Sequence, residues 1–68
     1  MKRKIIKFTI RPYDVTGHSR MNFNLNVGEE FVELEPLSEL LPPEEGYVFG
    51  VSGGHYMWVP ESHLSPRS

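Results

Sequence analysis

The fold of this chain is decided by residues 46–64, GYVFGVSGGHYMWVPESHL, and the other segments can be placed around them. Two runs of aromatic and β-branched residues meet at Gly53-Gly54, and paired glycines accept the positive φ angles of a tight hairpin turn. The stretch therefore predicts two antiparallel strands joined at this turn. Residues 60–63 predict a single 3₁₀ turn, followed by a short extended stub at Leu64.

Three more short strands are predicted upstream of this hairpin. Ile6, Phe8 and Ile10 alternate with polar residues, and a period of two indicates a strand whose apolar side chains point inward. Residues 23–27 and 30–35 also favour extended structure. Five short strands separated by turn signals predict a small all-β barrel, because closure hides strand edges that would otherwise be exposed.

The length of 68 residues fits a single domain, with a core over about 6–64 and a frayed tail at 65–68. A chain this short buries only about 60% of its unfolded surface, so its core has to be compact. The absence of cysteine excludes a disulfide or thiolate metal site and fits a reducing, cytoplasmic setting. No window approaches the roughly 18 apolar residues of a membrane span, so we expect a soluble protein without a membrane partner.

The motifs that could carry chemistry lack their structural context, so no enzymatic activity, cofactor or metal is expected. His18, His55 and His63 lie on separate segments without the spacing of a zinc site. Residues 50–54, GVSGG, match the G-x-S-x-G pattern of serine hydrolases. That motif needs a strand–turn–helix on a large sheet, whereas here it falls on a hairpin.

Residues 36–45, PLSELLPPEE, interrupt the strand pattern. Leu37, Leu40 and Leu41 have the i, i+3, i+4 spacing of a helical face, and the two prolines at 42–43 would end such a helix after one turn. So short a helix is unstable alone. It therefore either packs on its own domain or offers an apolar surface to a partner.

Charge is distributed unevenly, although the net charge is only −2. Residues 1–20 contain six lysines and arginines against one acid, and residues 21–45 contain seven glutamates and no base. These two oppositely charged segments either form an ordinary solvated surface or orient a charged partner. The acidic remainder opposes phosphate binding, but the basic start of the chain keeps a nucleic-acid interface open as an alternative, through Lys2, Arg3, Lys4 and Lys7.

Three aromatic residues gather on the predicted hairpin: Tyr47, Tyr56 and Trp58. Val59 is expected to point into the core, so the alternation of a strand places Trp58 on the outer face. An outward tryptophan is either a binding hot spot or needs a covering loop. The leucine-rich residues 36–45 are a candidate for that cover.

The order and spacing of several segments resemble the Src-homology-3 family over residues 8–64. The segment PYDV at residues 12–15 resembles the family's ALYDY motif, and FNLNVGE at 23–29 resembles its LSFKKGD run. The closing FPSNYV of the family is similar to VPESHL at 59–64. The resemblance implies a five-stranded barrel, with residues 36–45 as an extended n-Src-type loop that holds one short helical or 3₁₀ turn.

In this family, proline-rich peptides lie across a groove of aromatic side chains. Three of the family's groove positions are supplied here by Tyr13, Tyr47 and Pro60. Val15 and His63 stand where the family has tyrosines, and Tyr47 stands in place of a tryptophan. Residues 17–20, GHSR, are basic where the family's loop is acidic and receives a peptide arginine. The resemblance therefore implies the fold, with a groove that departs from the one that binds the standard ligand.

We therefore expect a non-enzymatic protein–protein interaction module, as a monomer or weak oligomer. Its partner would be a protein or peptide, proline-rich ligands included, bound by Tyr13, Tyr47, Trp58, Pro60, His63, Leu37, Leu40 and Leu41. The alternatives are a nucleic-acid-associated barrel and a subunit whose edge strands join a larger assembly. A domain of this size fits a small accessory or inhibitory protein of bacterial or phage type.

Overall fold

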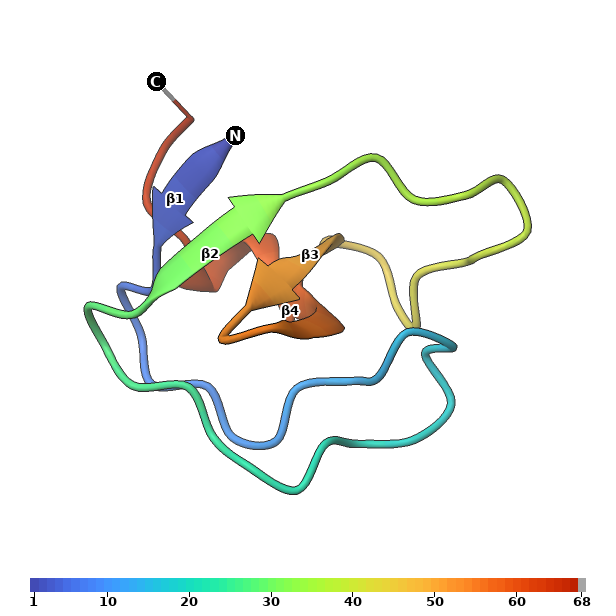
Figure 1. Cartoon of the computed structure of the whole chain (residues 1–68), viewed down its shortest axis with the longest axis horizontal. Helices are drawn as coiled ribbons and strands as arrows, with labels where there is room; N and C mark the ends of the chain where they lie inside the picture. The colour runs from blue at the N-terminus through green and yellow to red at the C-terminus, as the bar shows by residue number, and fades with distance from the viewer. Residues whose placement is uncertain (68) are drawn as a thin grey trace.

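A computed structural model describes residues 1–67 and shows an all-β chain with one antiparallel sheet (Figure 1). The sheet has the order β1-β2-β3-β4. Its strands and the single 3₁₀ helix that follows them are β1 (Lys2–Lys4), β2 (Glu30–Glu33), β3 (Tyr47–Ser52), β4 (His55–Pro60) and η1 (Glu61–His63).

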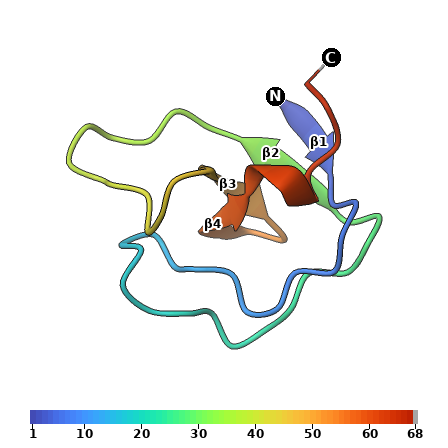
Figure 2. The same cartoon turned by 180° about the vertical axis from the view of Figure 1, so that it is seen from behind.

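The predicted hairpin and the 3₁₀ turn after it are confirmed. β3 and β4 pair from Tyr47 opposite Pro60 to Ser52 opposite His55, and Gly53 and Gly54 adopt φ angles of 58° and 81°. Paired glycines accept two such angles in succession without strain. Figure 2 shows η1 following β4 directly and leading the chain back toward β1.

The prediction of a closed barrel with five strands is wrong in both respects, because the sheet has four strands and stays open. The extended stub expected at Leu64 makes one bridge, with Ile5. The segment expected to form the first strand likewise contributes one bridge, between Thr9 and Leu25. Each segment makes too few successive backbone hydrogen bonds to form a further strand of the sheet.

The prediction that Ile6, Phe8 and Ile10 point inward is also wrong, since they are 48%, 49% and 65% exposed. Ile5 and Thr9 are buried in their place. A shift of one residue exchanges the two faces of an extended segment. Here the core takes Ile5 and Thr9 but not Lys7, and Ile6, Phe8 and Ile10 are left as an exposed apolar row.

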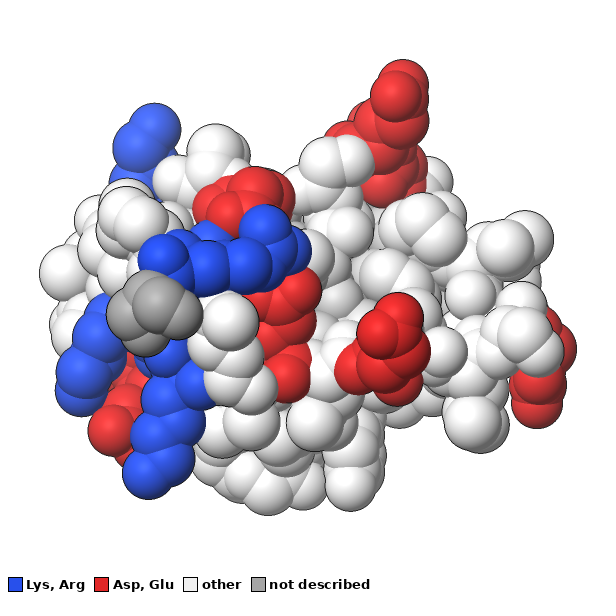
Figure 3. All heavy atoms as spheres, turned by 90° about the horizontal axis from the view of Figure 1, so that it is seen from above, with Lys and Arg blue, Asp and Glu red and all other residues white. Residues whose placement is uncertain are grey.

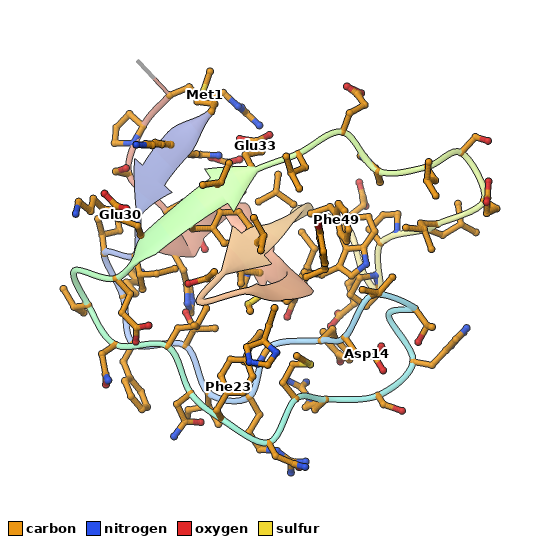
Figure 4. The ribbon with its side chains drawn as sticks, viewed as in Figure 1. Met1, Asp14, Phe23, Glu30, Glu33 and Phe49 are labelled. Atoms are coloured by element: carbon orange, nitrogen blue, oxygen red, sulfur yellow. The ribbon has the colours of Figure 1, made fainter. Side chains whose placement is uncertain are left out.

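The core lies between the sheet and the long connection that follows β1. Its fully buried side chains are Ile5, Leu25, Phe31, Met57, Val59 and Leu64. Phe23 and Val48 pack against them, and Figure 4 shows Phe23 below the turn that joins β3 and β4. The core therefore takes residues from both ends of the chain.

Trp58 is buried, with 2% of its surface exposed, so of the two expected outcomes it is covered by a loop and does not form an exposed hot spot. Tyr13 lies beside the edge of β4 and exchanges backbone hydrogen bonds with Trp58. The indole Nε1–H donates to the carbonyl of Val15 at 2.9 Å. The loop after β1 therefore contributes cover that was expected from residues 36–45.

Residues 36–45 form no helix, and the expected helical or 3₁₀ turn is present only as a single hydrogen-bonded turn. The amide of Leu40 donates to the carbonyl of Leu37 at 2.9 Å, which closes one isolated turn. Prolines before and after this turn restrict the backbone and remove donors, so no second turn can form. Leu37 and Leu41 are 65% and 71% exposed, while Leu40 is half-buried. The loop projects from the domain instead of covering it with its leucines (Figure 1).

Arg3 is buried and joins the two ends of the chain. Its guanidinium donates to Glu33 Oε1 at 2.8 Å, to both carboxylate oxygens of Glu61, and to the carbonyl of Ser65 at 2.8 Å. Arg67 donates to the second oxygen of Glu33 at 2.8 Å. Residues 65–67 are therefore not the frayed tail that was predicted, and Ser68 lies outside the described residues. Figure 4 shows Glu33 beside Met1 at this end of the molecule.

Candidate functional site

The exposed apolar row lies along one side of a surface hollow of about 290 Å³, which we call the groove. The other side is made where Tyr47 at the start of β3 pairs with Pro60 at the end of β4. Five apolar residues line the groove: Phe8, Ile10, Pro12, Tyr47 and Pro60. Three polar residues complete it: Thr9, Arg20 and His63. The fold thus brings together segments up to 55 positions apart, from Phe8 to His63.

Tyr13 supports the groove from the long loop and fixes Arg20 at its edge. The rings of Tyr13 and Tyr47 meet edge to face, with centroids 5.5 Å apart. The Arg20 guanidinium lies 4.2 Å from the centre of the Tyr13 ring. It donates to the Tyr13 hydroxyl at 2.9 Å and to the carbonyl of Arg11 at 3.2 Å. A cation held over an aromatic face by two further hydrogen bonds has a defined position.

The backbone is strained at the same edge. Arg11 has a φ of 39°, in the left-handed region that side chains other than glycine rarely adopt. Its amide donates to Asn24 Oδ1 at 3.0 Å, and its Nε–H donates to the carbonyl of Met21 at 2.9 Å. Such strain costs on the order of 1 kcal/mol and persists where the surrounding contacts fix the conformation. The turn at Arg11 separates Ile10 from Pro12 and so shapes the wall of the groove.

His63 is oriented by Thr9 on the opposite wall. The Thr9 hydroxyl lies 2.9 Å from His63 Nδ1 and 3.1 Å from the carbonyl of Lys7. Its one proton can be donated to either group, so the direction of the contact with Nδ1 depends on the tautomer of His63.

Burial raises the pKa of the Tyr47 hydroxyl, and the negative charge of Glu44 and the nearby Tyr13 raise it further. The positive charge of Arg20 acts in the opposite direction. The net direction is upward from the ordinary value of 10.0. Tyr47 therefore keeps its proton at neutral pH, and its hydroxyl remains a hydrogen-bond donor.

Four of the residues predicted to bind a partner come together here: Tyr13, Tyr47, Pro60 and His63. Trp58 does not join them, since it lines a second hollow of about 280 Å³, which shares Tyr47 with the groove and is also lined by Glu33 and Glu35. Phe8, Ile10 and Arg20 were missed. The row of Phe8 and Ile10 was visible in the sequence, but it was assigned to the core face.

The three predicted leucines lie away from the groove. Leu40 and Leu41 line a third hollow of about 480 Å³, between the loop around Gly17 and residues 36–45, together with Glu39. Leu37 lines none of the three hollows. The larger third hollow is formed by two loops and contains no aromatic side chain, so the groove is the stronger candidate for a binding site.

The residues proposed for a nucleic-acid interface do not form a free basic face. Arg3 is buried among acids, and Lys4 lies 3.7 Å from Glu30. Lys2 and Lys7 are exposed. Figure 3 shows lysines and arginines mixed with acidic side chains at the end that holds the termini, while only acidic side chains appear at the opposite end. This surface offers phosphate contacts only from scattered lysines.

The remaining motifs have structural roles. Ser52, at the centre of the hydrolase-like pattern, is buried and donates its hydroxyl to the carbonyl of Glu30 at 2.7 Å. Within residues 1–67, histidine, cysteine and acidic side chains form no group of three that could hold a metal ion. The same part of the chain contains no helix with the length and apolar character needed to cross a membrane.

Comparison with known proteins gave no family model, no curated protein and no solved structure that matches this chain.

Removing the indole nitrogen of Trp58 is expected to destabilise the domain. In Trp58→Phe, the carbonyl of Val15 loses its donor and the smaller ring leaves a gap, at a combined cost of about 2 kcal/mol. Urea unfolding followed by circular dichroism measures this loss. The matched control is Tyr56→Phe, which changes an exposed neighbouring ring and should cost less than about 0.5 kcal/mol. Equal midpoints for the two variants would contradict the burial of Trp58.

Proposed function

We propose that this protein is a non-enzymatic interaction module that binds a protein or peptide segment in the groove. One observation carries the proposal: the fold leaves Phe8 and Ile10 about half or more exposed beside a hollow that is also lined by Tyr47 and Pro60. Apolar and aromatic side chains that gather around a hollow with a few oriented polar groups are typical of binding sites.

The polar groups of the groove support a peptide as the ligand. Tyr47 offers a phenolic hydroxyl and His63 offers an imidazole ring, and each of these groups can donate or accept a hydrogen bond. An extended peptide presents both amide donors and carbonyl acceptors along its length. The groove can therefore pair with backbone groups while its apolar wall receives a side chain.

The resemblance to the Src-homology-3 family supports the same location. The family's peptide groove corresponds by position to Tyr13, Tyr47, Pro60 and His63, and these four are the predicted residues that lie together. A long loop after β1, a tight β3–β4 hairpin and the η1 turn follow one another in the order that the resemblance implies. We propose a distant relation to that family on this basis.

Selection from a random library of displayed 12-residue peptides tests the proposal and does not depend on the identity of the natural partner. We expect enriched peptides whose affinity falls about 30-fold when Phe8→Ser or Ile10→Ser is introduced, since loss of one buried anchor commonly costs about 2 kcal/mol. Both residues are exposed in the free protein, so the fold should survive either change.

The matched control is Val27→Ser, which removes an equally exposed apolar side chain that does not line the groove. This variant should bind the selected peptides as the parent protein does. A selection that enriches no peptide, or only peptides that bind all three variants equally, would refute the proposed function.

A further inference from the structure

We propose that the groove selects ligands with a carboxylate, which Arg20 receives beside the apolar wall formed by Phe8 and Ile10. The inference rests on the proposed function and specifies its partner as an acidic segment of a peptide or protein. Such an acidic segment is opposite in charge to the arginine-containing peptide that the Src-homology-3 resemblance implies. The charges that line the three hollows and the geometry of Arg20 support it.

Arg20 is a cation without an anionic partner among the residues that the structure describes, 1–67. The ion pairs found in residues 1–67 involve Arg3, Lys4 and Arg67, and none includes Arg20. An arginine carries five N–H donors. Arg20 uses two of them, toward Arg11 and Tyr13, so three remain for a ligand.

The guanidinium is held in place before a ligand arrives. Stacking on the Tyr13 ring and the two hydrogen bonds restrict the side chain, although it is exposed to solvent. A restricted side chain loses less conformational entropy on binding than a free one. The planar guanidinium also matches the two oxygens of a carboxylate, which favours a paired hydrogen bond.

The groove differs from the other two hollows in its charge. No aspartate or glutamate lines it, and Arg20 and His63 are its ionisable bases. The hollow beside Trp58 is lined by Glu33 and Glu35, and the hollow between the loops is lined by Glu39. In a chain with net charge −2, the absence of acids from the groove makes it the place where an anionic ligand meets least repulsion.

Nearby charges fit this assignment. Arg20 lies close enough to Tyr47 to lower the pKa of its hydroxyl, against the effect of burial. Glu44 acts on the same hydroxyl in the opposite sense, but Glu44 does not line the groove.

The peptides selected above for binding to the groove provide the probes. We expect them to contain aspartate or glutamate, and we expect Arg20→Gln to weaken their binding about tenfold, which is the range of one charge-assisted interaction. Replacing the acidic residue of a peptide with its amide should cause the same loss. The two changes together should cost little more than either alone, because both remove one contact.

The matched control is Lys2→Gln, which removes the same charge from β1 outside the groove and should leave affinity within about twofold once salt is present at about 0.15 M. Selected peptides that depend on Phe8 but lack an acid, or that bind Arg20→Gln as well as the parent protein, would overturn this inference and leave the proposed function standing. Loss of dependence on Phe8 and Ile10 would overturn both.

Discussion

Arg3→Met is expected to lower the free energy of unfolding by about 3 kcal/mol, because removing one member of a buried ion pair leaves its partners without compensation. Methionine fills most of the space but cannot donate to Glu33, Glu61 or the carbonyl of Ser65. The two carboxylates, which already act on each other unfavourably, would retain only Arg67. Urea unfolding at pH 7 measures the loss.

The pH dependence of this loss identifies its cause. Hydrogen bonds from Arg67 and Arg3 hold the pKa of Glu33 below its ordinary value of 4.5, and the hydrogen bond from Arg3 lowers that of Glu61. In acid, the unfolded chain therefore binds more protons than the folded one. The stabilisation is complete above pH 4.5, and it is lost as the pH falls through the lower pKa values that the two carboxyls have in the folded protein. The difference between Arg3→Met and the parent protein should shrink below about pH 4.

Lys4→Met is the matched control for this experiment. It makes the same substitution at the next position of β1, where the lysine is exposed and its contact with Glu30 is 3.7 Å long. Exposed pairs of this kind contribute about 0 to 1 kcal/mol. A loss in Arg3→Met no larger than that in Lys4→Met, or a loss that is constant from pH 7 to pH 3, would contradict the role of the buried network.

Gly50→Ala is expected to cost about 3 kcal/mol, at the upper end of the range for overpacking a core. A Cβ atom on Gly50 would lie 2.4 Å from Cζ of Phe31 and 2.4 Å from the carbonyl oxygen of Val32. The ring can move only by disturbing the core, and the carbonyl belongs to β2, which pairs with β3 through Glu33 and Gly50. Thermal and urea unfolding would both report the loss.

The double variant Gly50→Ala with Phe31→Leu separates the two contacts. Shortening the ring removes one clash, but the carbonyl of Val32 stays in place, so the double variant should remain less stable than Phe31→Leu alone. Equal stability of these two would show that the backbone of β2 adjusts freely. A domain of this length has a total stability of about 3 to 10 kcal/mol, so either single substitution discussed here removes a large share of it.

The sequence predicted the elements whose causes are local. The Gly53-Gly54 turn follows from backbone φ angles alone, and the turn at Glu61–His63 follows from residues next to Pro60. Local residues do not determine whether the sheet closes into a barrel. Closure depends on how many backbone hydrogen bonds form between the segments around Ile5 and Leu64, and the structure has only one bridge there.

The errors at the site have a common physical origin. The alternating pattern of residues 5–10 does not determine which side of the segment faces the core. The contact of Ile5 with the core decides this, and such a contact cannot be read from the pattern. For Trp58, alternation along β4 was enough to separate it from Val59. Its contacts with residues 13–20 were not predictable, because they are tertiary contacts between distant segments. The position of Arg20 over Tyr13 is likewise a tertiary contact.

The network around Arg3 also bears on how the chain folds as it is synthesised. Arg3 is synthesised before its partners, since Glu61 follows it by 58 residues and Ser65 and Arg67 come later still. A nascent chain that stops after β4 would have to bury Arg3 with only Glu33 to receive it, and an incompletely paired buried cation is strongly unfavourable. We expect the domain to fold in one late step, after nearly all of its residues have emerged.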